Sequence, residues 1–221
     1  MDTLVIACQT IEDEMKRALE LAGRDYPAVF LRPGLDDEPQ KLREAIEAEM
    51  NKLPDPSLVL LGYGFSNGAL VDFPAGRHTL VAPQAEDALC LILGSQVRRD
   101  QIMRATPTYL ITKGWLRGDN IFKAFQKSVE KFGPEKAARL HKSMLGHYKR
   151  FLLVDTGVYD LNEYRGPLEE LGQALGLSVE EEKGDVGWLV RLVSGPPWDQ
   201  GFVKAEPGQT LTIDPQAGSQ V

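Results

Sequence analysis

The sequence predicts an α/β fold: a mostly parallel sheet with helices on both faces, Rossmann-like, built as one domain or as two half-domains. Short apolar runs of strand length recur along the chain, beginning with Thr3–Cys8, and helical patterns follow most of them. The β-α-β-α-β order of the first sixty residues favours parallel strands with right-handed crossovers. With 221 residues, 43% of them hydrophobic, the chain is large enough for one large core or two small ones.

The elements of the first half follow from local patterns. Thr3–Cys8 is short and apolar, as expected of a buried parallel strand. Thr10 can cap the next helix, with Asp13 completing a partial capping box, and Gly23 ends that helix. The other elements expected here are strands at 28–31, 57–61 and 79–82, and helices at 39–51 and 86–94, the first of these helices with Leu42, Ile46 and Met50 on one face.

The second half continues the alternation. Gly133 separates two adjacent helices, and Gly176 ends a third. The chain beyond Gly208 is poor in core residues, so 1–208 is expected to form a single α/β domain, with a soft division near 112–118, followed by a partly disordered tail at 209–221. The elements expected in this half are strands at 108–112, 151–155, 177–181 and 201–205, and helices at 120–132, 134–145, 161–175 and 185–194.

Composition and charge exclude several function classes. The net charge is -7 and no basic stripe is visible, so a nucleic-acid binder is not expected. The sequence contains no run of 18 apolar residues, so no membrane span is predicted. The start of the chain lacks a signal-peptide pattern, and two cysteines, Cys8 and Cys90, form no disulfide framework, which favours the reducing cytoplasm. A homodimer is a general expectation for parallel-sheet proteins of this size.

The strand ends are where a ligand site is expected. In open α/β sheets, loops and helix N-termini converge beyond the carboxyl ends of the strands. Cys8 ends the first strand, where a thiolate close to a helix N-terminus could serve as nucleophile or metal ligand. The alternative, favoured because free cysteines are so often buried, is a small core residue that closes the strand.

The third expected strand leads into a glycine-rich segment, Gly62–Gly68. Glycines allow positive φ and a close approach of the backbone to a ligand, and Tyr63, Ser66 and Asn67 add polar groups. The segment lacks the Gly-Lys-Ser/Thr ending of a P-loop and the spacing of a dinucleotide fingerprint. A ligand-binding loop is the favoured interpretation, and a plain turn is the alternative.

Two acidic residues, Glu86 and Asp87, are expected in the first turn of the helix after the fourth strand. Acidic residues there commonly complement the helix dipole, and a catalytic or ligand role is the alternative. The fifth and sixth strands end at further polar or aromatic residues. The residues expected to bind a ligand are Cys8, Gln9, Thr10, Tyr63, Gly64, Ser66, Asn67, Thr112, Trp115, Asp155 and Thr156.

Four of these segments carry a family resemblance: Leu60–Gly64, Pro83–Asp87, Tyr109–Trp115 and Val154–Gly157. Together they make the chain, over 4–208, resemble a bacterial and archaeal family of unknown function (domain of unknown function, number 1638). Members of that family are often encoded near corrinoid-dependent methyltransferases in anaerobes. The resemblance therefore implies a corrinoid protein or a methyltransferase as partner.

The resemblance also implies a metal site that this chain does not keep. The family pattern has cysteines at the positions of Cys8, Ser66 and Ala88 and a histidine at that of Glu86, a donor set suited to a soft metal or an iron–sulfur cluster. Only Cys8 matches. We therefore expect a degenerate site, with no three-cysteine metal or iron–sulfur centre.

Three functions are compatible with these features. The first is a small-molecule-binding or accessory protein of anaerobic one-carbon and methyl-transfer metabolism, since no complete catalytic set is visible. The second is an enzyme with Cys8 as nucleophile or metal ligand and Glu86 or Asp87 as acid/base. The third is an interaction scaffold, which an exposed apolar patch on the helices at 121–145 would support.

Overall fold

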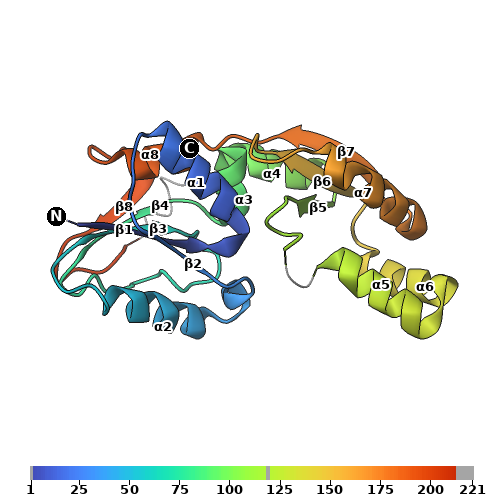
Figure 1. Cartoon of the computed structure of the whole chain (residues 1–221), viewed down its shortest axis with the longest axis horizontal. Coiled ribbons are helices and arrows are strands. Elements are labelled where there is room, and N and C mark those ends of the chain that lie inside the picture. Colours follow the sequence, from blue (N-terminus) through green and yellow to red (C-terminus); the bar gives the residue numbers. More distant parts are fainter. Residues whose placement is uncertain (1, 118–119, 213–221) are drawn as a thin grey trace. The chain divides into compact units, whose positions relative to one another are not determined.

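The structure, a computed structural model, describes residues 2–117 and 120–212 (Figure 1). Its mostly parallel sheets flanked by helices confirm the predicted α/β, Rossmann-like class. The chain divides into two compact units, residues 1–99 with 185–221 and residues 100–184. The segment 112–118 lies inside the second unit, and the expectation of one domain over 1–208 stays a prediction.

The first unit contains a five-stranded sheet in the order β2-β1-β3-β4-β8. The first four strands along the chain are parallel, and β8 is antiparallel to β4. Because β1, β3 and β4 are parallel neighbours, their carboxyl ends lie at one edge of the sheet. The strands are β1 (Thr3–Cys8), β2 (Ala28–Leu31), β3 (Leu58–Gly62), β4 (Thr79–Pro83) and β8 (Phe202–Ala205).

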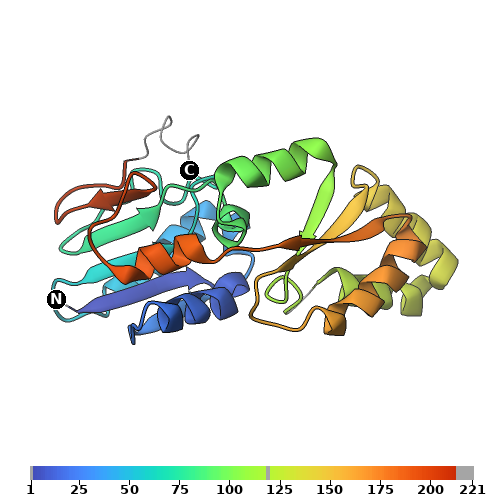
Figure 2. The same ribbon diagram turned by 90° about the horizontal axis from the view of Figure 1, so that it is seen from above.

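Helices cover both faces of this sheet (Figure 1). The chain crosses to β2 on one side of β1 and then to β3 on the other, so right-handed crossovers place α1 and α2 on opposite faces. Figure 2 shows α8 (orange) alongside α1 (blue). The helical elements of this unit are the 3₁₀ turns η1 (Gln9–Ile11) and η2 (Leu35–Asp37), with α1 (Glu12–Leu21), α2 (Pro39–Met50), α3 (Ala88–Leu93) and α8 (Gly187–Ser194).

The second unit contains a three-stranded parallel sheet in the order β5-β6-β7. Both of its crossovers advance in the same direction, so the helices they contain cover the same face. Phe151, Leu153, Leu168 and Leu171 form the centre of the core between that face and the helices. The elements are β5 (Thr108–Ile111), α5 (Ile121–Phe132), α6 (Pro134–Leu145), β6 (Arg150–Asp155), α7 (Asn162–Leu175) and β7 (Ser178–Lys183).

Three local details differ from the sequence-based expectations. α3 begins at Ala88, so Glu86 and Asp87 precede the helix. Helix α4 (Gln96–Ala105) is not among the expected elements, because its sequence has little apolar periodicity. In the structure this helix buries only Gln96. Leu211, in the predicted tail, is fully buried and pairs through its backbone with Phe73.

Residues 213–221 of the predicted tail lie outside the described residues. Within the part of the chain that is described, no helix is long and apolar enough to cross a membrane.

Candidate functional site at the carboxyl edge of the five-stranded sheet

The ends of β1, β3 and β4 meet at one edge. Ala7 of β1 is in register with Gly62 of β3, which places Cys8 beside the start of the glycine-rich loop. The loops after β3 and β4 continue the pairing of their strands: the N–H of Phe65 donates to the carbonyl of Ala85 (3.0 Å), and the N–H of Ser66 donates to that of Glu86 (2.8 Å). The three predicted segments are therefore neighbours in the first unit.

Gly64 is required by this close approach of two loops. A Cβ at Gly64 would lie 2.4 Å from the carbonyl oxygen of Glu86 and 2.6 Å from the backbone nitrogen of Asp87. Backbone atoms cannot move aside as a flexible side chain could, so only glycine fits here. This contact explains why glycine occupies position 64 without reference to any ligand.

Cys8 is buried, with 2% of its surface exposed. The hydroxyl of Thr10 donates to its sulfur (3.1 Å), and the thiol donates to the Asp36 carboxylate, with Sγ 3.7 Å from Oδ2. Burial raises the pKa of Cys8, and the charge of Asp36 raises it further, whereas the Thr10 hydrogen bond lowers it. The net direction is upward, which favours the thiol over the thiolate and supports the buried-residue interpretation.

Asp36 is a member of the site that the sequence reasoning missed. It lies in η2, after β2, and the register of Cys8 with Leu31 of β2 brings the two loops together. The residue as a whole is exposed, but its carboxyl group is partly buried. This burial is the main reason why the pKa of Asp36 is raised. The sequence did contain a feature that could have indicated Asp36: it is an acidic residue shortly after β2, a strand that was correctly predicted.

Tyr63 has the most unusual environment at this edge. Its side chain is 3% exposed, and among the described residues its buried hydroxyl has no hydrogen-bond partner. Burial raises the pKa of Tyr63 strongly, with smaller contributions from nearby Cys8 and Asp36, so the phenol stays protonated. A buried hydroxyl without a partner costs about 1–3 kcal/mol, which a bound hydrogen-bond acceptor would offset.

Glu86 and Asp87 are held in a network that organises the start of α3. Asp87 accepts from two backbone N–H groups of that helix as its N-cap, and its Oδ2 lies 2.7 Å from a guanidinium nitrogen of Arg99. The Gln96 side chain donates to the Glu86 carboxylate (2.8 Å), and its carbonyl accepts from the Glu86 backbone N–H (3.0 Å). Both acidic residues therefore have structural roles here.

The remaining predicted residues divide between the two units. Gln9 and Thr10 form part of η1 and are half-buried, and Ser66 is exposed. The Asn67 side chain accepts from the N–H of Ala69 (2.9 Å), which closes the turn after β3.

Four predicted residues lie at the carboxyl ends of β5 and β6 in the second unit. The hydroxyl of Thr112 accepts from the N–H of Trp115 (3.4 Å). The Asp155 carboxylate accepts from the N–H of Gly157 (3.0 Å), and the adjacent Thr156 is 8% exposed. A ligand-binding role for any predicted residue, in either unit, stays a prediction.

The side chains at this edge do not fit the three-cysteine centre that the resemblance implied. Ala88, the first residue of α3, has no donor atom, and Ser66 offers a hydroxyl in place of a soft thiolate. In residues 2–117 and 120–212, no group of three histidine, cysteine, aspartate or glutamate side chains is arranged to hold a metal ion.

A family model described as "Protein of unknown function (DUF1638)" matches residues 30–193, most of the chain. The chain belongs to the DUF1638 family. The match includes the loops after β3 and β4 and all of the second unit, but it begins after Cys8. Searches of curated proteins and of solved structures found no match.

Proposed function

We propose that the first unit binds a small polar molecule at the carboxyl edge of its sheet, and that the protein acts as a binding or accessory protein. The observation that carries this proposal is the hydroxyl of Tyr63, which is buried and has no partner among the described residues. Buried polar groups in native proteins almost always have a hydrogen-bond partner, and a ligand is one way to supply it.

The neighbouring groups indicate what kind of molecule would bind. Tyr63 offers a hydroxyl donor, and the Asp36 carboxylate offers acceptor oxygens close to Cys8. An anionic ligand would be repelled by Asp36, so the favoured ligand is neutral or cationic. It carries an acceptor for Tyr63 and a donor for Asp36, as a small amide or amino alcohol does.

A binding role explains these observations better than the enzyme alternative. Nucleophilic catalysis needs a thiolate, and burial beside the Asp36 carboxylate disfavours that form of Cys8. The candidate acid/base residues, Glu86 and Asp87, are engaged with Gln96 and Arg99. The more specific role, in anaerobic one-carbon and methyl-transfer metabolism with a corrinoid protein or a methyltransferase as partner, rests on the family resemblance alone.

Thermal unfolding of the full chain with three probes tests the binding role. Acetamide is neutral, ethanolamine is cationic and acetate is anionic, and the three are similar in size. We expect acetamide or ethanolamine at millimolar concentration to raise the Tm, because a ligand that binds the folded state stabilises it, and acetate to have no effect.

Tyr63→Phe should abolish the stabilisation by the probes. Without a probe it should leave the Tm unchanged or slightly raised, because it removes the unpartnered hydroxyl. Tyr26→Phe is the matched control, since Tyr26 belongs to the same unit and its ring packs near Arg24 instead. The proposal is lost if no probe raises the Tm, or if the probes stabilise Tyr63→Phe as much as the natural protein.

A further inference from the structure

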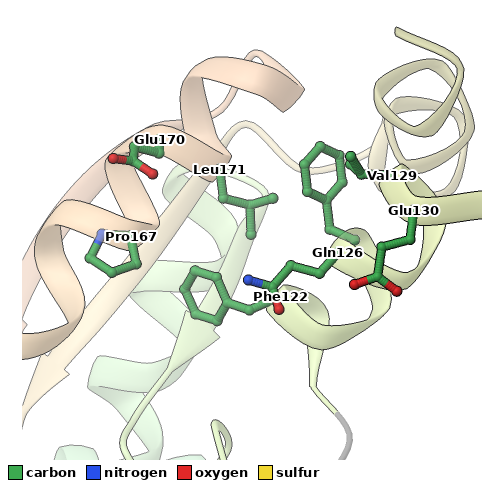
Figure 3. Close-up of a pocket in the computed structure, with 8 residues that line it drawn as sticks. Phe122, Gln126, Val129, Glu130, Pro167, Glu170 and Leu171 are labelled. Atoms are coloured by element: carbon green, nitrogen blue, oxygen red, sulfur yellow. The ribbon is translucent and has the colours of Figure 1, made fainter. Parts of the chain in front are cut away.

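A groove lies between helices α5 and α7 of the second unit, and none of the residues expected from the sequence to bind a ligand lines it (Figure 3). Its volume is about 470 Å³, within the range of small-molecule sites. Figure 3 shows Phe122 of α5 and Leu171 of α7 on facing walls. Phe125 and Val129 continue the apolar wall on α5.

The wall formed by α5 is strongly amphipathic but incompletely covered. Phe122, Phe125 and Val129 recur on one face at helical spacing, yet none of the residues of α5 is fully buried. Phe125 is held edge-on against the ring of His141, with 5.3 Å between centroids, so its orientation is set before any ligand arrives. The groove is thus a preformed apolar surface that remains partly exposed in this chain.

The groove also carries negative charge on both sides. Glu130 extends from α5 and Glu170 from α7, and both line the groove. In the part of the chain that the structure describes, neither carboxylate has an ion pair or a side-chain hydrogen bond. No cationic side chain lines the groove. Among the described residues, the two carboxylates are thus free of direct ion pairs and remain available to a ligand.

We propose that this groove binds an organic cation with an apolar body. The phenyl rings and the aliphatic side chains would contact the apolar body, and a positive charge is attracted both to carboxylates and to the face of an aromatic ring. An anionic ligand of the same shape would meet two like charges, and a neutral one would gain only the apolar contact. This site is independent of the carboxyl edge in the first unit.

Three ligands of similar shape test the inference by isothermal titration of the full chain: phenethylammonium, 2-phenylethanol and 3-phenylpropanoate. We expect phenethylammonium to bind with a Kd on the order of 1 mM, as a ligand of this size allows. The neutral alcohol should bind at least about fivefold more weakly, the carboxylate should not bind detectably, and added salt should weaken binding of the cation.

Substitutions of residues that line the groove test whether phenethylammonium binds there. Glu130→Gln combined with Glu170→Gln keeps the shape of the groove and should weaken phenethylammonium binding about fivefold, to the level of the alcohol. Glu169 is next to Glu170 on α7 but does not line the groove, so the Glu169→Gln variant should bind phenethylammonium as the natural protein does. Phe122→Leu should weaken binding of both the cation and the alcohol. Far-ultraviolet circular dichroism confirms that each variant is folded.

Several results would overturn the inference. Equal binding of the alcohol and the cation would remove the role of charge, and undiminished binding by the double Glu→Gln variant would place the cation elsewhere. Absence of phenethylammonium binding would exclude the site. Sedimentation that shows a dimer, dissociated by Phe122→Leu, would mean that a second copy of the chain occupies the groove instead.

Discussion

The sulfur of Cys8 lies 3.7 Å from Oδ2 of Asp36, although the two residues are 28 positions apart in the sequence. The contact joins the last residue of β1 to the 3₁₀ turn η2 that follows β2, and the two strands are parallel neighbours in the sheet. A carboxylate at this distance opposes loss of the thiol proton, because a thiolate would place two negative charges side by side. The pair therefore favours a protonated Cys8, with consequences for its reactivity.

Asp36→Asn should make Cys8 more reactive. Removing the negative charge lowers the pKa of the thiol, so the thiolate fraction rises at a given pH. We expect faster alkylation of Cys8 by iodoacetamide at pH 8, measured by mass spectrometry of the Cys8 peptide. Cys90 in the same sample is an internal control, because burial raises its pKa to about 12 and Asp36 is not among the groups that shift it. Equal alkylation rates in the two proteins would contradict the influence of Asp36.

Asp87→Ala should destabilise the first unit by about 1–3 kcal/mol, because it removes the N-cap of α3 and the ion pair with Arg99 together. Asp87→Asn retains an oxygen that can cap the helix and should recover most of this loss. Urea unfolding provides the measurement. If Asp87→Asn proves as unstable as Asp87→Ala, the cap is not the main contribution of this residue.

Gly64→Ala should cost about 1–3 kcal/mol of stability, since its Cβ would overlap the backbone at Glu86 and Asp87. The matched control is Gly166→Ala in α7, where a Cβ meets nothing within 4 Å apart from neighbouring residues of its own helix. Alanine has the higher helix propensity, but its Cβ would crowd the ring of Pro167, so the control should change the stability by less than about 1 kcal/mol. Chemical denaturation of both variants tests the close approach of the two loops; a neutral Gly64→Ala would argue against it.

His78 should make the protein less stable as the pH falls from 7 toward 5. His78 is 3% exposed, its Nδ1 accepts from the backbone N–H of Ser57 (3.2 Å), and burial lowers its pKa from 6.5. As the pH drops below 6.5, the unfolded chain takes up this proton before the folded one does, so the free energy of unfolding decreases until the lower pKa of the folded state is passed.

His78→Asn keeps an acceptor for Ser57 but cannot titrate in this range, so the decrease between pH 7 and pH 5 should be smaller. His147→Asn is the control, because His147 is exposed, and it should retain the dependence of the natural protein. Urea midpoints at a series of pH values provide the comparison. An identical slope in His78→Asn and the natural protein would show that another group is responsible.

Local patterns in the sequence were enough to predict most of the fold. The apolar run of β1 is confirmed at the predicted bounds, and Gly133 separates α5 from α6 as expected. α4 escaped prediction because its helical state depends on tertiary contacts, through Gln96 and Arg99, more than on an apolar face of its own. Periodicity predicts an element only where burial of one face stabilises it.

The sequence by itself determined which segments form strands, and the crossover rule was enough to bring Cys8 and the loop beginning at Tyr63 to one edge. Only the tertiary structure decided the partners of their polar atoms: Asp36 beside Cys8, Arg99 beside Asp87, and no described partner for the Tyr63 hydroxyl. The physical reason is that hydrophobic burial and hydrogen bonding differ in how specific a partner they need. An apolar pattern is stabilised by burial of any suitable kind, whereas a hydrogen bond needs one particular atom, brought close by a distant part of the chain.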